Sequence, residues 1–80
     1  MNRFDLCIIL NSKKYIEYVN AYAFILDMDN EPYYDVEIWN FTAFKGAKID
    51  IINKKYLRPA TAKEQEEFQE KWKKYIADME

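Results

Sequence analysis

The clearest candidate for metal chemistry is the acidic stretch at 27–31, which reads Asp-Met-Asp-Asn-Glu. Carboxylate and amide oxygens are the ligands that calcium prefers. A calcium-binding loop also needs a flexible residue at its sixth position and a bidentate carboxylate at its twelfth. Counted from Asp27, those positions hold Pro32 and Ile38. The stretch therefore predicts a polar turn, and we expect no metal site.

Catalytic side chains are scarce in this chain. It has no histidine, one glycine and one cysteine, so histidine acid–base chemistry and a glycine-rich phosphate loop lack their residues. The cysteine, Cys7, lies in the apolar run Leu6–Leu10, and apolar surroundings raise the pKa of a thiol and make it inert. We expect a protein that is not an enzyme and binds no cofactor.

Five basic side chains gather between positions 45 and 58, where only Asp50 opposes them. They are Lys45, Lys48, Lys54, Lys55 and Arg58. Aromatic residues alternate with them, and such a mixture can neutralise phosphates and stack on bases. Dedicated nucleic-acid-binding domains are usually basic throughout, whereas this chain has an isoelectric point of about 5.2. Nucleic-acid binding through this segment is therefore the alternative hypothesis, beside lysines that discourage pairing at a sheet edge.

Charge and hydropathy place further limits on the class of protein. Residues 1–40 carry three basic and seven acidic groups, and residues 41–80 carry nine and seven, so the chain is bipolar with a net charge of −2. No segment approaches the roughly 20 apolar residues that a membrane span needs. A single cysteine inside an apolar run is typical of a protein from a reducing compartment. We expect a cytoplasmic protein that does not contact a membrane.

The elements that must position these residues are mainly strands. Apolar residues recur from Arg3 to Asn11, which predicts a strand that is central in the sheet or covered. The polar turn at 29–32 separates two apolar runs, and the strict alternation from Tyr33 to Trp39 completes a predicted hairpin. A loop around the only glycine then leads to a strand over Ala47–Asn53.

The stretch from Ser12 to Leu26 permits two interpretations. Its β-branched and aromatic residues favour a loop near Ser12–Lys14 followed by a strand. Alternatively, Ser12 could cap a helix with an apolar stripe. The sequence leaves both conformations open.

The C-terminal segment predicts an amphipathic helix. Thr61-Ala62-Lys63-Glu64 matches the capping box that begins many helices. The apolar residues Phe68, Trp72, Ile76 and Met79 follow at spacings of four, four and three, which places them on one face.

Three stretches match, in this order, the three parts of one pattern. The parts are a strand ending in acidic turn residues, a tyrosine-valine strand and a final leucine before a proline. The stretches are 23–30 (Ala-Phe-Ile-Leu-Asp-Met-Asp-Asn), 34–37 (Tyr-Asp-Val-Glu) and 55–61 (Lys-Tyr-Leu-Arg-Pro-Ala-Thr). In this the chain resembles SH3-like small-barrel proteins, including those of phages and mobile elements. The chain departs from that family in having only Gly46 for tight corners. It also lacks the ALYDY-type signature, so the resemblance does not imply binding of PxxP peptides.

The resemblance implies an α+β fold, with a small and mainly antiparallel sheet in an SH3-like barrel and an appended C-terminal helix. The alternative is a β-α-β-β-α sheet with both helices on one face. Either way we expect a single domain over 1–80, mainly β over 1–58 and helical over 59–79.

Aromatic residues suggest where such a domain meets its partner. Fourteen of 80 residues are aromatic (Trp 2, Tyr 7, Phe 5), and a chain this small cannot bury them all. Tyr33, Asp35, Glu37 and Trp39 form the outward row of the predicted strand, and exposed Tyr and Trp are enriched at interfaces. We therefore predict a protein-binding surface there, in a small binding protein that also has the potential to form a homodimer. Its size and composition resemble accessory proteins of phages and mobile elements, which inhibit or retarget host enzymes or defence complexes.

Overall fold

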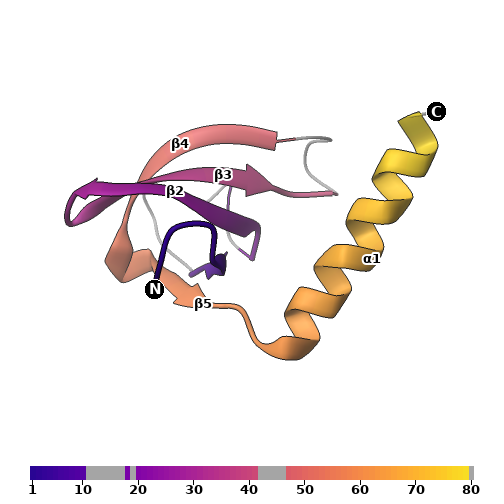
Figure 1. The fold of residues 1–80 in the computed structure, drawn as a ribbon, viewed down its shortest axis with the longest axis horizontal. Helices are drawn as coiled ribbons and strands as arrows, with labels where there is room; N and C mark the ends of the chain where they lie inside the picture. Colours follow the sequence, from indigo (N-terminus) through magenta and orange to yellow (C-terminus); the bar gives the residue numbers. More distant parts are fainter. Residues whose placement is uncertain (11–17, 19, 42–46, 80) are drawn as a thin grey trace.

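The computed structural model describes residues 1–10, 18, 20–41 and 47–79, and it shows an antiparallel sheet with a helix at one end (Figure 1). The sheet has five strands in the order β4-β3-β2-β1-β5. In chain order the elements are β1 (Leu6–Ile9), β2 (Tyr22–Asn30), β3 (Tyr33–Trp39), β4 (Ala47–Asn53), the 3-10 turn η2 (Lys54–Tyr56), β5 (Leu57–Pro59) and α1 (Ala62–Met79). The α+β class with a mainly antiparallel sheet is confirmed.

Strand β3 shows how the alternation of the sequence creates two faces. Tyr34, Val36 and Ile38 are almost fully buried, whereas the residues between them keep some exposure. We call the side of the sheet that carries these three residues the inner face and the opposite side the outer face. The inner face holds one apolar core, made of Cys7, Ile9, Tyr18, Ala21, Ala23, Ile25, Tyr34, Val36, Ile38, Ile52 and Leu57.

Strand β1 is apolar on both faces because both are covered. Cys7 and Ile9 lie in the inner core, while Ile8 belongs to a second cluster on the outer face. The strand is shorter than the predicted span from Arg3 to Asn11. Phe4 adopts a positive φ of 68° and is 66% exposed, so the chain bends away from strand geometry before Leu6.

The stretch from Ser12 to Leu26 resolves in part. Strand β2 includes Tyr22–Leu26, so the helical interpretation is wrong for that part and the strand interpretation holds. The predicted strand begins too early, because the amide of Ala21 donates to the carbonyl of Tyr18 (2.9 Å) and Asn20 has a φ of 65°. This hydrogen bond and the positive φ belong to a turn that precedes β2. The loop predicted at Ser12–Lys14 lies outside the described residues.

The capping box of α1 forms as predicted. The amide of Glu64 donates to Oγ1 of Thr61 (3.2 Å), and the amide of Thr61 donates to Oε1 of Glu64 (2.9 Å). The same carboxylate accepts two hydrogen bonds of 2.7 Å from the guanidinium of Arg58 on β5. This combination lowers the pKa of Glu64 from 4.5 to about 2, with the Arg58 contact as the largest cause. The helix is thereby tied at its first turn to the edge strand that precedes it.

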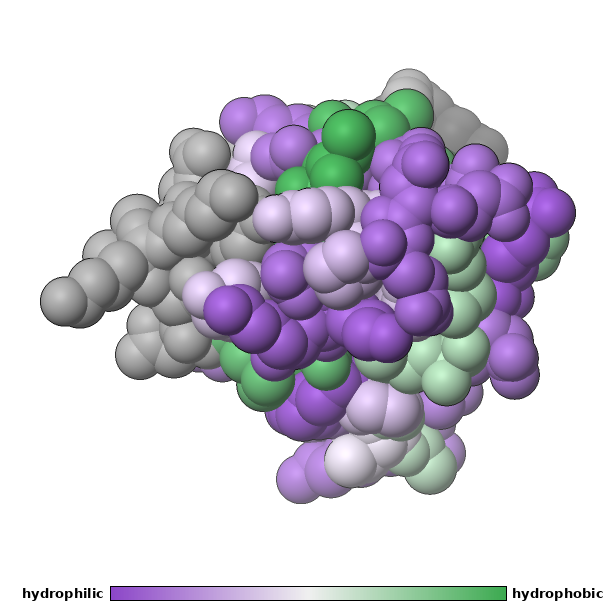
Figure 2. All heavy atoms as spheres, turned by 90° about the vertical axis from the view of Figure 1, so that its left-hand side faces the viewer, coloured by the Kyte–Doolittle hydropathy of each residue, from purple (hydrophilic) through white to green (hydrophobic). Residues whose placement is uncertain are grey.

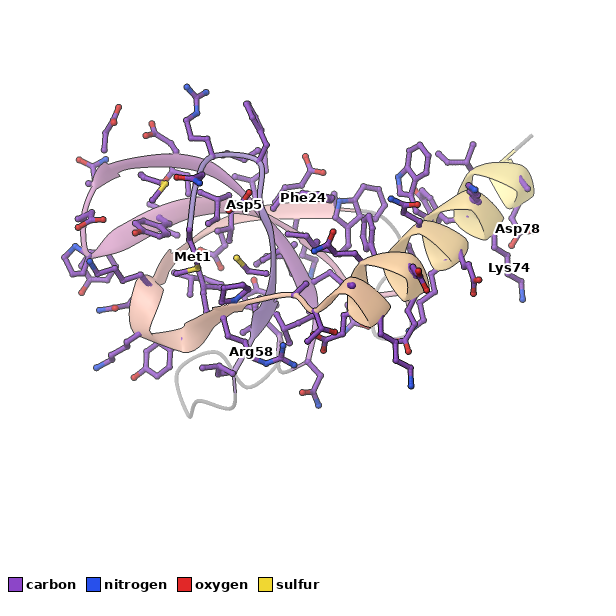
Figure 3. All side chains as sticks on the ribbon, turned by 60° about the horizontal axis from the view of Figure 1, so that its bottom comes forward. Met1, Asp5, Phe24, Arg58, Lys74 and Asp78 are labelled. Atoms are coloured by element: carbon purple, nitrogen blue, oxygen red, sulfur yellow. The ribbon has the colours of Figure 1, made fainter. Side chains whose placement is uncertain are left out.

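The face of α1 that meets the sheet differs from the predicted one. Phe68 is buried and Tyr75 contacts the rings of β3 and its extension, so the packed face follows positions 68 and 75. Lys71 lies between them and places its Nζ 5.4 Å above the ring of Tyr22. Trp72 is 41% exposed, so its predicted place on the packed face is wrong. The far end of the helix extends past the sheet, where Lys74 and Asp78 point outward (Figure 3).

The sheet is not closed into a barrel, since β4 and β5 stand at its two edges. The alternative β-α-β-β-α arrangement requires a helix up to Leu26, and there the chain is strand. Among the described residues, no helix is long and apolar enough to span a bilayer.

Candidate functional site

Helix α1 covers one end of the outer face through a cluster of aromatic rings. Phe68 lies at its centre, with ring centroids 5.1 Å from Tyr22, 5.1 Å from Phe24, 5.8 Å from Phe41 and 6.3 Å from Trp39. Edge-to-face contacts at such distances are favourable beyond the area they bury. By packing here, the helix places several aromatic residues in a second apolar cluster, on the outer face.

Trp39 belongs to this cluster. Its ring stacks on Phe41 at 5.7 Å and meets Tyr75 edge-on at 5.5 Å, and its indole N–H donates to Oε1 of Glu37 (2.7 Å). The structure does place Tyr33, Asp35, Glu37 and Trp39 on one face of β3, as predicted. Trp39, however, packs under α1, whereas Tyr33 at the other end of the strand is 42% exposed.

The remaining part of the outer face is uncovered by described residues and carries two exposed isoleucines. Ile49 is 73% exposed and pairs with Glu37, and Ile51 is 55% exposed and pairs with Asp35. Together with Tyr33 they form what we call the open face: Tyr33, Asp35, Glu37, Ile49 and Ile51. Figure 2 shows a hydrophobic patch at the top of the molecule, at the height of β4 in Figure 1.

On strand β4 polar side chains lie on the inner face and apolar side chains on the outer face, which reverses the usual alternation. Lys48 and Asp50 share the inner face with Ile38 and Val36, their partners on β3, while Ile49 and Ile51 point to the outer face. Asp50 is held there because the hydroxyl of Tyr18 donates to its Oδ2 (3.0 Å). The two large apolar side chains are therefore exposed by the register of the sheet.

Acidic groups border the open face. Asp27 on β2 is opposite Asp35 on β3, next to irregularities in the pairing of the two strands. Like charges directly opposite each other are destabilising unless something neutralises them. Glu31, in the turn between β2 and β3, accepts hydrogen bonds from Lys54 (3.0 Å) and from the hydroxyl of Tyr34 (2.8 Å), and these contacts lower its pKa. No group of three potential metal ligands occurs within the described part of the chain.

The structure spreads the basic segment over several elements. Lys54 is ion-paired with Glu31 and Arg58 with Glu64, so the carboxylates neutralise two of its charges. Lys55 lies on η2 with its Nζ 5.1 Å from the ring of Tyr56, and Lys48 is on β4. Lys45 lies outside the described residues. Nucleic-acid binding by this segment remains a prediction.

Cys7 is fully buried in the inner core. Burial is the main reason that its pKa rises to about 11, with the charge of Asp5 as a second cause. A thiol with that pKa is almost entirely protonated at neutral pH and is a poor nucleophile.

A depression of about 410 Å³ lies on the far side of the aromatic cluster from the open face. The N-terminal segment, β5 and the first turns of α1 enclose it, with Asp5, Phe24 and Gln69 among its lining residues. Figure 3 labels Asp5 and Phe24 at this place. None of the residues predicted to bind a protein or a nucleic acid lines it within the described chain.

Comparison of the chain with protein-family models, with curated proteins and with solved structures found no match. The geometry of the outer face therefore carries the functional argument.

Sequence reasoning missed Ile49 and Ile51. The alternation Lys48-Ile49-Asp50-Ile51 is that of a strand with a buried apolar face, and a single strand does not reveal which face is covered. Ile52 follows directly, breaks the alternation and is fully buried. This residue is the signal that could have shown that the other face of the strand points to the core.

Proposed function

We propose that this chain is a small, non-catalytic protein-binding module, of the kind with which phages and mobile elements bind and modulate a host or defence protein. The open face is its binding surface. The observation that carries this proposal is the exposure of Ile49 and Ile51 on a regular strand, next to carboxylates. Burying an exposed isoleucine in a partner is worth roughly 1.5–3 kcal/mol, so two of them supply a binding anchor.

The chemistry of the surface defines the partner. Its centre is apolar, and Asp27, Asp35 and Glu37 lie beside it. A partner that places apolar side chains on Ile49 and Ile51 and a lysine or arginine next to Asp35 satisfies both features, because it also relieves the opposed carboxylates of Asp27 and Asp35.

An SH3-like curvature of the sheet is part of this proposal. The edge strands β4 and β5 are joined by the three residues of η2, so the chain passes from one edge of the sheet to the other within one turn. Such a short connection supports a sheet that curls, so that the ends of its two edge strands next to η2 lie close together. Leu57, the first residue of β5, accordingly packs in the same core as Ile52 of β4.

Affinity capture with matched variants tests the binding surface. The tagged chain is used to isolate a partner from the cell that encodes it, and the purified pair is measured by calorimetry. We expect the double variant I49S/I51S to weaken binding at least about tenfold, since it removes two buried anchors. W72S changes an exposed apolar residue on α1, away from the open face, and keeps the affinity. Unchanged affinity of I49S/I51S, with the fold intact by circular dichroism, would refute the proposal.

A further inference from the structure

The outer edge of β4 carries main-chain groups that no described residue pairs with in the sheet. The amide of Lys54 donates to the carbonyl of Pro32 (2.8 Å), whereas the amide of Ile51 donates to Oδ1 of Asp50 (2.7 Å). In an antiparallel strand, the amide and carbonyl of one residue point to the same side, and the sides alternate along the strand. The even-numbered residues of β4 therefore form their main-chain hydrogen bonds with β3. The main-chain groups of Ala47, Ile49 and Ile51 point away from β3, to the open edge of the sheet.

An open edge is a template for another strand, and two copies of β4 can pair there about a two-fold axis. Four central registers keep the odd-numbered residues of the two copies bonded to each other. The register with Ile51 at the axis places Asp50 opposite Ile52 and brings no opposite charges together. The other three pair charged residues. One places Lys48 opposite Lys48 and another places Asp50 opposite Asp50, and both oppose like charges. The third places Ile49 opposite Ile49 and therefore Lys48 opposite Asp50 on both sides of the axis. Charge complementarity selects this register.

We propose that the chain forms a homodimer by antiparallel pairing of β4 with β4 of a second copy, with Ile49 at the two-fold axis. Two Lys48–Asp50 pairs flank the axis on the inner face. Ile51 of each copy lies opposite Ala47 of the other on the outer face. The amide of Ile51 exchanges its bond with Asp50 for the carbonyl of Ala47 in the second copy, which frees Oδ1 of Asp50 for Lys48.

The dimer extends the open face without covering it. The side chains of Ile49 and Ile51 remain on the outer face after the edges pair, so the two sheets join into one with a continuous apolar strip across the axis. This inference concerns the edge of β4 and does not depend on the proposed binding of another protein by its face.

Sedimentation equilibrium of the full chain tests the pairing. We expect wild type to reach twice the monomer mass of 9.7 kDa as its concentration rises. K48E places two carboxylates opposite each other on each side of the axis. We expect it to weaken the dimer about fourfold or more, because two attractive cross-strand pairs become two repulsive ones. D50K acts in the same way with two lysines. A mixture of K48E and D50K restores opposite charges and gives a heterodimer.

A cross-linking pair tests the register even if D50K fails to fold. Residues opposite each other in a bonded antiparallel pair have Cα atoms about 5.5 Å apart, which suits a disulfide. I49C therefore forms an intermolecular disulfide under oxidised glutathione. I51C does not, because its counterpart is roughly 13 Å away along the strand. The native Cys7 is buried and does not interfere.

Three results would overturn the inference: wild type that stays monomeric at millimolar concentration, a K48E dimer as tight as wild type, or equal cross-linking of I49C and I51C. Binding of the protein partner by K48E, the variant with the weakened dimer, separates the two proposals, because that variant retains Ile49 and Ile51 on the open face.

Discussion

Replacing Phe68 by alanine should detach α1 from the sheet. Phe68 is 6% exposed and lies within 6.3 Å of four aromatic rings, those of Tyr22, Phe24, Trp39 and Phe41. Removing a buried phenylalanine from such a site costs about 3–5 kcal/mol. A chain of 80 residues has a stability of roughly 4–12 kcal/mol, at 0.05–0.15 kcal/mol per residue. The substitution therefore removes a large share of the total.

Trp72 provides the matched control, because it is an aromatic residue on the same helix that is 41% exposed. We expect W72A to lower the free energy of unfolding by less than about 1 kcal/mol. Urea unfolding of both variants is followed by far-UV circular dichroism for the helix and by tryptophan fluorescence, which reports on Trp39 and Trp72 together in F68A and on Trp39 alone in W72A. In F68A the helix signal is lost at lower urea than in wild type, and the tryptophan emission shifts toward that of solvated indole as Trp39 loses its cover.

A loss below about 1 kcal/mol in F68A would refute the packing of α1 on the outer face. Equal losses in F68A and W72A would show that the helix turns a different side to the sheet. In either case Trp39 would be exposed on β3 and would again be a candidate interface residue.

Two further predictions concern charged groups. The pKa of Glu64 is lowered to about 2 from 4.5, so its carboxylate stabilises the fold above pH 4.5, and that stability is lost as the pH falls toward 2. Acid titration of the unfolding free energy should therefore show a smaller decline in E64Q than in wild type, and an identical decline would contradict the role of the Arg58 contact. Because Lys54 and Arg58 are ion-paired, we expect no gel shift of duplex DNA at micromolar protein in about 50 mM salt. A shift that weakens with salt and disappears in K54E/K55E would instead support the nucleic-acid hypothesis.

The sequence contained enough local information to predict the strands and the start of the helix. The alternation of β3 sets Tyr34, Val36 and Ile38 inward, and Thr61 with Glu64 forms the predicted cap. These features depend on residues a few positions apart, which periodicity and capping rules describe well.

The fate of individual aromatic residues could not be predicted in the same way. Whether Trp39 is an interface residue or a core residue depends on where α1 packs, and that depends on Phe68, about 30 positions away. Likewise, the outward placement of Ile49 and Ile51 follows from the register of β4 on β3. The turn before β2 depends on Asn20 with its positive φ, a conformation that no pattern of apolar residues signals.

The pairing of β1 with β5 has a consequence for how the chain folds. Strands β2, β3 and β4 follow one another as neighbours, whereas β1 meets β5 through Ile8 and Arg58, about 50 residues apart in sequence. Closing that long loop costs more entropy than closing either hairpin, so the hairpins are the natural nucleus. Helix α1 packs on Ile8 and follows β5 directly, so its surface is complete only after this closure. We therefore expect α1 to be the last element to gain its full set of tertiary contacts.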